Sequence, residues 1–186
     1  MLFKLTEKIR SLDLEPIKFK MMSEEDGAGM TLEAVNKLER QYKVFLLAIG
    51  KNPGMSIVPT KSIDEMWHYH ILDTELYMAQ CKEVFGRFVH HFPYFGIRNN
   101  QDAENLKSAF EKSLPIYEEC SAELYGEILI KSDKAIHLLG ECDPGSYCSD
   151  TGACDSGGGD KITIAGCAIT QQSHSIDQMM LNRPRL

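Results

Sequence analysis

Apolar side chains recur every three or four residues through much of the first 139 residues, a spacing that places them on one face of an α-helix. The first such pattern predicts a short amphipathic helix over residues 2–14. Pro16 ends this helix or opens the next element. The stretch 21–30 is polar and contains glycines, so we expect a loop there.

A second apolar stripe predicts a helix from Leu32 to about Ile49. Thr31 is suited to capping its N-terminus, because a threonine hydroxyl can accept a hydrogen bond from a free backbone N–H. Gly50 and Pro53 follow in the order that usually ends a helix.

A third helix is predicted from about Ile63 to Val84, ending near Gly86. Ser62 and Glu65 have the spacing of a capping box, in which each side chain bonds the backbone of the other. We therefore expect one continuous helix through the middle of the chain.

One more long helix is expected after an aromatic loop at 87–100. It begins near Gln101 and keeps its apolar stripe to Leu124. Pro115 removes one backbone hydrogen bond, which predicts a kink or two abutting helices. Residues 131–139 are suited to one or two further helical turns.

These elements predict a mainly α, single-domain bundle of four to six helices over residues 1–139. The remaining segment, 140–186, holds many glycines and four of the six cysteines but few apolar residues. Burial of so little apolar surface does not offset the entropy of ordering the chain, so we expect a disordered tail. Within it, 162–164 is suited to one short strand.

The composition narrows the class of protein. A formal charge of -7 and a pI near 5.4 argue against a nucleic-acid-binding surface. The first twelve residues lack the apolar run of a signal peptide, and no stretch approaches the ~18 apolar residues of a membrane span. We therefore expect a cytoplasmic protein with reduced cysteines, whose partner is a protein or a small molecule rather than a nucleic acid or a membrane.

Candidate chemistry is concentrated in residues 64–93, which contain four of the six histidines and the only tryptophan, Trp67. Successive helical residues turn by about 100°, so His68 and His70 point about 200° apart and do not easily bind one ion together. The histidines therefore define two alternative sites.

In the first alternative, Asp64 and His68 lie one helical turn apart and supply two metal ligands. His90 or His91, brought back by the loop, supplies a third. The non-functional interpretation is that Asp64 and His68 form only a surface ion pair near the start of the helix.

In the second alternative, His70 lies on a buried stripe with Asp73 and Tyr77 nearby, again joined by a loop histidine. A carboxylate there would hold the imidazole in one tautomer. The purely structural interpretation is that His70 is a hydrogen-bonded core residue.

Two further residues of this stretch have structural interpretations. Trp67 is most simply explained as a residue packed in the core, and Cys81 is either a thiolate ligand or a buried structural cysteine.

The run Asp-Glu-Met-Trp-His-Tyr-His-Ile-Leu-Asp-Thr at 64–74 and the His-His-Phe-Pro sequence at 90–93 carry a resemblance. The chain resembles the glycine-rich domain-containing proteins of plants and bacteria over about residues 30–126. The glycine- and cysteine-containing stretch 140–167 looks like a sparse version of the segment that follows this domain in the family. The resemblance implies a helical domain without a defined reaction.

Our leading hypothesis is a metal-binding domain with zinc or iron held by histidines, possessing hydrolytic or oxidative activity if it is an enzyme. Asp64 or Asp73 would orient a ligand or carry a proton. The alternative hypothesis is a protein–protein interaction module in which the histidines are structural. The sequence leaves the choice between the two open.

Overall fold

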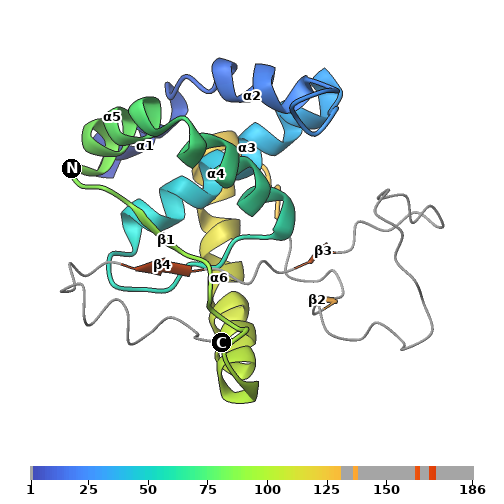
Figure 1. Ribbon diagram of the computed structural model, residues 1–186. Coiled ribbons are helices and arrows are strands. Elements are labelled where there is room, and N and C mark those ends of the chain that lie inside the picture. Colours follow the sequence, from blue (N-terminus) through green and yellow to red (C-terminus); the bar gives the residue numbers. More distant parts are fainter. Residues whose placement is uncertain (1, 131–135, 138–161, 164–167, 171–186) are drawn as a thin grey trace.

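The computed structural model describes residues 2–130, 136–137, 162–163 and 168–170 (Figure 1). Within this part of the chain the predicted mainly helical bundle of four to six helices is confirmed. The six helices are α1 (Leu2–Arg10), α2 (Glu15–Met22), α3 (Leu32–Lys51), α4 (Lys61–Leu72), α5 (Thr74–Phe85) and α6 (Asn100–Tyr125).

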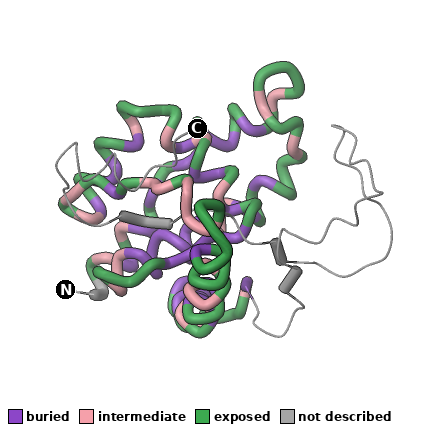
Figure 2. Tube along the Cα trace, turned by 60° about the horizontal axis from the view of Figure 1, so that its bottom comes forward, coloured by how far each residue is buried: buried purple, intermediate pink, exposed green. Residues whose placement is uncertain are grey.

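Helix α3 lies at the centre of the bundle and contacts α1, α2, α4 and α6. Every residue from 42 to 49 is buried, so this helix is apolar around most of its circumference in its C-terminal half. Thr31 caps it as predicted, its hydroxyl accepting a hydrogen bond from the Ala34 N–H at 3.2 Å. Figure 2 shows the buried segments gathered inside the bundle, with exposed residues on the outer faces.

Helix α2 occupies residues 15–22, so the loop predicted over 21–30 begins two residues later than expected. Pro16 opens the helix, one of the two roles considered for it. Ile17 and Met21 are one turn apart and buried against the core. Two buried apolar positions are too few to produce a clear helical period in the sequence.

The prediction of one continuous central helix is wrong, because the chain breaks at Asp73 between α4 and α5. The backbone of Asp73 leaves helical geometry (φ -81°, ψ 75°), and its carboxylate accepts a hydrogen bond from the Leu76 N–H at 3.2 Å. Aspartate competes for backbone donors in this way, which favours helix starts over helix interiors. The predicted capping box is also wrong: Thr60, rather than Ser62, caps α4.

Helix α6 is a single element that contains Pro115, so the alternative of two abutting helices is not observed. The loop before α6 is tied to its first turn by Asp102, which accepts hydrogen bonds from the Gly96 N–H at 2.7 Å and the Arg98 side chain at 2.5 and 3.0 Å. The Arg98 guanidinium holds the pKa of the Asp102 carboxyl below its ordinary value.

The predicted aromatic loop also contains a short strand, β1 (His90–Phe92), which pairs antiparallel with β4 (Ala168–Thr170). A second pair is formed by β2 (Ile136–His137) and β3 (Ile162–Thr163), which run parallel. Strand β2 stands where helical turns were expected, and β3 agrees with the predicted short strand. The rest of the predicted disordered tail lies outside the described residues.

One hydroxyl connects α4, α5 and the segment leading into β1. Tyr77 accepts a hydrogen bond from the Trp67 indole N–H at 3.0 Å and donates one to the Val89 carbonyl at 2.6 Å. All three residues are buried. This arrangement, the tyrosine tie, fixes the start of β1 against α4.

We predict that Tyr77→Phe lowers the free energy of unfolding by about 2 kcal/mol, because it leaves a buried N–H and a buried carbonyl without a partner. Chemical denaturation measures the change. Tyr94→Phe is the matched control, since the Tyr94 hydroxyl forms no hydrogen bond with the described residues. Equal stability of the two variants would show that the tie contributes nothing.

Candidate metal centre

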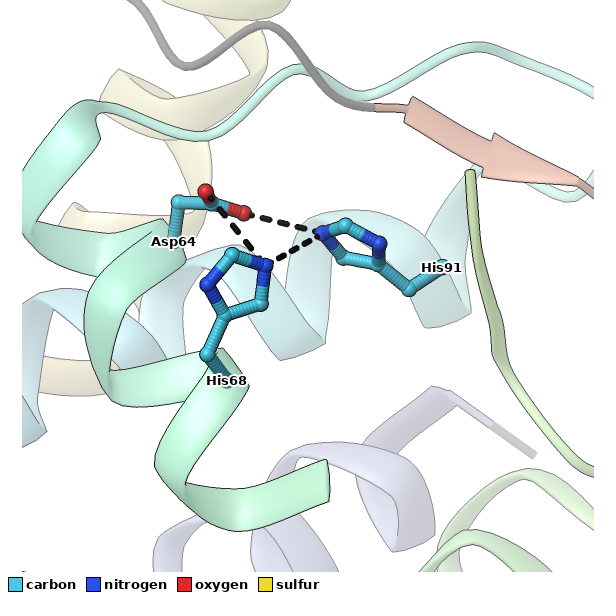
Figure 3. A group of neighbouring side chains, drawn as sticks. All are labelled: Asp64, His68 and His91. Atoms are coloured by element: carbon cyan, nitrogen blue, oxygen red, sulfur yellow. Dashed lines mark hydrogen bonds and ion pairs between the residues drawn. The ribbon is translucent and has the colours of Figure 1, made fainter. Parts of the chain in front are cut away.

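Asp64 and His68 lie one turn apart on α4, and their side chains meet the ring of His91 from β1 (Figure 3). The Nε2 atoms of the two imidazoles are 2.9 Å apart. The carboxylate lies beside both rings, with Oδ1 at 3.2 Å from Nε2 of His91 and Oδ2 at 3.7 Å from Nε2 of His68. One potential ligand atom from each residue lies within 4.8 Å of the other two. We call these three residues the Asp–His–His cluster.

The local structure explains why these side chains meet. Residues four apart on a helix share a face, which brings Asp64 and His68 together. Successive strand residues point to opposite sides, so only one of two adjacent histidines on β1 faces α4. His91 is that residue, whereas His90 is exposed and its ring packs against Phe88.

The cluster is enclosed on two sides and open on the third. The Asp64 and His91 side chains are 15% and 11% exposed, whereas His68 is 51% exposed. Trp67 packs edge-to-face on the His91 ring, with centroids 4.6 Å apart, and Phe45 packs on Trp67 from the core. His91 is therefore held by the core, and solvent reaches the cluster past His68.

The spacing of the potential ligand atoms suits a bound ion. In a tetrahedral site with bonds of about 2.0–2.1 Å, neighbouring ligand atoms stand about 3.3 Å apart. The separations of 2.9, 3.2 and 3.7 Å lie on both sides of that value. Two imidazoles and a carboxylate are also a donor set that zinc and iron both accept. The cluster can therefore hold a metal ion with small side-chain movements.

The second sequence-based alternative does not assemble among the described residues. His70 is buried, and its Nδ1 lies 2.9 Å from the Tyr42 hydroxyl. Its ring meets those of Tyr42 and Tyr77 edge-on, and no other histidine joins it. Burial lowers the pKa of His70 to about 4, although nearby Gln80 and Asp73 oppose the shift. His70 thus has the environment of a neutral core residue.

The remaining sequence candidates lie outside the Asp–His–His cluster. Asp73 is exposed and caps α5, at the opposite end of α4 from Asp64. Tyr77 forms the tyrosine tie. Cys81 is buried beside Tyr77 and the Val89 backbone, and burial raises the pKa of its thiol, which disfavours the thiolate form that binds metals.

Sequence reasoning missed strand β4, which pairs with the strand that carries His91. The register places Ile169 opposite His91, and β3 lies near α4. Two short pieces of the C-terminal segment therefore contact the two elements that bear the cluster. Three residues of alternating character are too short a signal to identify a strand.

The fold and the cluster define a helical protein with a candidate metal centre of two histidines and one aspartate. Residues 5–124 match the model of the family described as UCP032817-like, and the chain belongs to that family. No curated protein and no solved structure matches the chain. In the described residues, no helix combines the length and apolar character needed to cross a membrane.

The family match corrects the resemblance to glycine-rich domain-containing proteins, which is wrong. That resemblance rested on the histidine-containing run of α4 and the His-His-Phe-Pro sequence. A short run of this kind reflects the local demands of a helix and a turn, whereas the family match extends from α1 almost to the end of α6.

The pKa of His70 predicts a specific loss of stability in acid. Its folded-state value of about 4 lies below the ordinary 6.5, so the neutral ring stabilises the fold above pH 6.5. This contribution, about 3 kcal/mol, is lost as the pH falls from 6.5 towards 4. We expect His70→Gln to flatten the pH dependence of unfolding in chelator-treated protein. His90 is exposed, so His90→Gln is the control and should leave the pH dependence of unfolding unchanged. If the two variants changed this dependence equally, the loss of stability in acid would not be due to His70.

The β1–β4 pairing predicts that the C-terminal segment helps to hold His91. Ile169→Pro removes a backbone N–H and disfavours the strand, so a metal ion held at the Asp–His–His cluster should bind about tenfold more weakly, with unchanged helical circular dichroism. Ile169→Val keeps the strand and serves as control. Competition with a fluorescent chelator measures the affinity. Identical affinities in the two variants would mean that β4 does not hold the site.

Proposed function

We propose that this protein binds a divalent transition metal through Asp64, His68 and His91. The observation that supports the proposal most strongly is the convergence of two imidazole Nε2 atoms and a carboxylate from two elements, α4 and β1. Exposed acidic groups often gather without binding an ion. Two imidazole Nε2 atoms at 2.9 Å are different, because their lone pairs repel unless a shared proton or a metal ion lies between them. The second observation is the packing of Trp67 on His91, which orients one ligand in advance.

Zinc is the first choice of ion and iron(II) the second. Two of the three separations, 3.2 and 3.7 Å, exceed the approximately 3.0 Å expected between neighbouring ligands of an octahedral ion. A tetrahedral ion fits these separations better, which favours zinc. Iron(II) in proteins also uses two histidines and one carboxylate, so the donor set itself is compatible with both.

The open side of the cluster points to reactivity rather than to a purely structural ion. Structural zinc sites close around the ion with four protein ligands, whereas catalytic sites use three and leave one position for water. A zinc ion held here would lower the pKa of bound water and favour hydrolytic chemistry, and iron(II) would favour oxidative chemistry. Access past His68, which is half exposed, would admit a small substrate.

Each residue of the cluster then has a defined part. His91, held by Trp67, provides the fixed ligand, and His68 provides the mobile one at the opening. Asp64 lies against both imidazoles and supplies the negative charge that offsets part of the charge of a divalent ion. From the sequence we expected Asp64 either to be a metal ligand beside His68 or to orient a ligand or carry a proton. Its position favours direct ligation.

A second candidate function follows from the direct contacts within the cluster. His91 lies within hydrogen-bonding distance of both His68 and Asp64. Both contacts use Nε2 of His91, so a proton on that atom would be shared between Asp64 and His68 and would join β1 to α4 without an ion. The histidines would then be structural, as the interaction-module hypothesis requires. The two functions differ in what the loss of one histidine removes: a bound ion in the first, fold stability alone in the second.

Metal analysis of purified protein and its variants tests the proposal. We expect about one zinc or iron per chain in the wild type, and at least a tenfold loss of affinity in His68→Ala, His91→Ala and Asp64→Asn. His68→Ala is the most informative variant, because an exposed side chain can be removed with little effect on folding. His90→Ala, on the same strand and also exposed, is the matched control and should retain the metal.

If the wild type binds neither zinc nor iron(II) under anaerobic reconstitution, the metal site does not exist. If, in addition, His91→Ala lowers the melting temperature, the interaction module becomes the better account.

A further inference from the structure

A cavity of about 500 Å³ lies between α1, the C-terminal end of α3 and the C-terminal end of α5. Figure 1 shows α1 and α5 side by side, next to the N-terminus. Gly50 allows the three helices to approach here, since a Cβ at this position would lie 2.8 Å from a methyl carbon of Leu5 and 3.2 Å from the Phe85 ring. The volume falls within the range of small-molecule sites.

The lining of this cavity divides into an apolar part and a basic part. Leu5, Val84 and Phe85 contribute apolar surface. The charged side chains among the lining residues are all cations, and they are Lys4, Lys8 and Arg87. No carboxylate is among the lining residues, although the chain as a whole has a formal charge of -7.

One of these cations, Lys8, has a hydrogen-bond partner within the fold. Lys8 donates a hydrogen bond to the Glu83 carbonyl near the C-terminus of α5, where a positive charge is favourable. Lys4 and Arg87 form no ion pair or hydrogen bond with any described residue. Their charges are therefore available to a ligand.

We propose that this cavity binds a small organic monocarboxylate with an apolar body, such as a medium-chain acid. The planar guanidinium of Arg87 matches a carboxylate with two parallel N–H donors, and Lys4 adds a second positive charge. The apolar side chains cover the body of the ligand. A bare inorganic anion would leave that apolar surface in water, and a neutral apolar molecule would leave the cations unused. The site shares no residue with the Asp–His–His cluster and does not depend on a bound metal.

Calorimetric titration of the full chain with octanoate tests the inference, with the protein treated with chelator so that carboxylate binding to a metal does not contribute. We expect one octanoate per chain. Octan-1-ol, which has the body without the charge, and acetate, which has the charge without the body, should each bind at least tenfold more weakly.

Arg87→Gln and Lys4→Gln should each weaken octanoate binding, Arg87→Gln by at least about tenfold. Lys37→Gln is the control, since Lys37 is exposed on α3 and does not line the cavity. Lys4 is also exposed, so its variant tests the site even if Arg87→Gln folds poorly. The inference is overturned if octanoate does not bind at millimolar concentration. It is equally overturned if octan-1-ol or acetate binds as tightly, or if the cavity variants bind like the control.

Discussion

The geometry of the candidate metal centre depends on one buried hydroxyl. Tyr77 bonds both the Trp67 indole and the Val89 carbonyl, and so joins the helix that carries two potential ligands to the segment that leads to the third. Because Trp67 also packs on the His91 ring, the contact between Trp67 and Tyr77 fixes both the position of β1 and the orientation of the imidazole. Rigid core groups of this kind give a site a defined geometry before any ligand arrives.

The helical part of the fold could be predicted because its signals are local. The helix that begins after Thr31 could be predicted from a capping residue and a regular apolar stripe, and both lie within a few residues of each other. The break at Asp73 was missed because an aspartate within an apolar period suits either a helix interior or a new helix start. A new helix starts here because the Asp73 carboxylate accepts a hydrogen bond from the Leu76 N–H. The spacing of apolar residues alone does not reveal this hydrogen bond.

The candidate site was predictable only in part. Helical spacing pairs Asp64 with His68, and it separates His68 from His70. The choice between His90 and His91 depends on which side of β1 faces α4, and the register of that strand is set by contacts distant in sequence. The burial of His70 similarly depends on Tyr42 from α3, twenty-eight residues away. Long-range packing therefore decides between alternatives that local patterns leave equal.

The most direct test of the account is a crystal structure of the zinc-loaded protein with an anomalous difference map at the zinc absorption edge. The account predicts one strong peak about 2.0–2.1 Å from Nε2 of His68, Nε2 of His91 and a carboxylate oxygen of Asp64, with a fourth position facing solvent. A map without a peak at these three residues, or with the zinc bound only elsewhere, would contradict it.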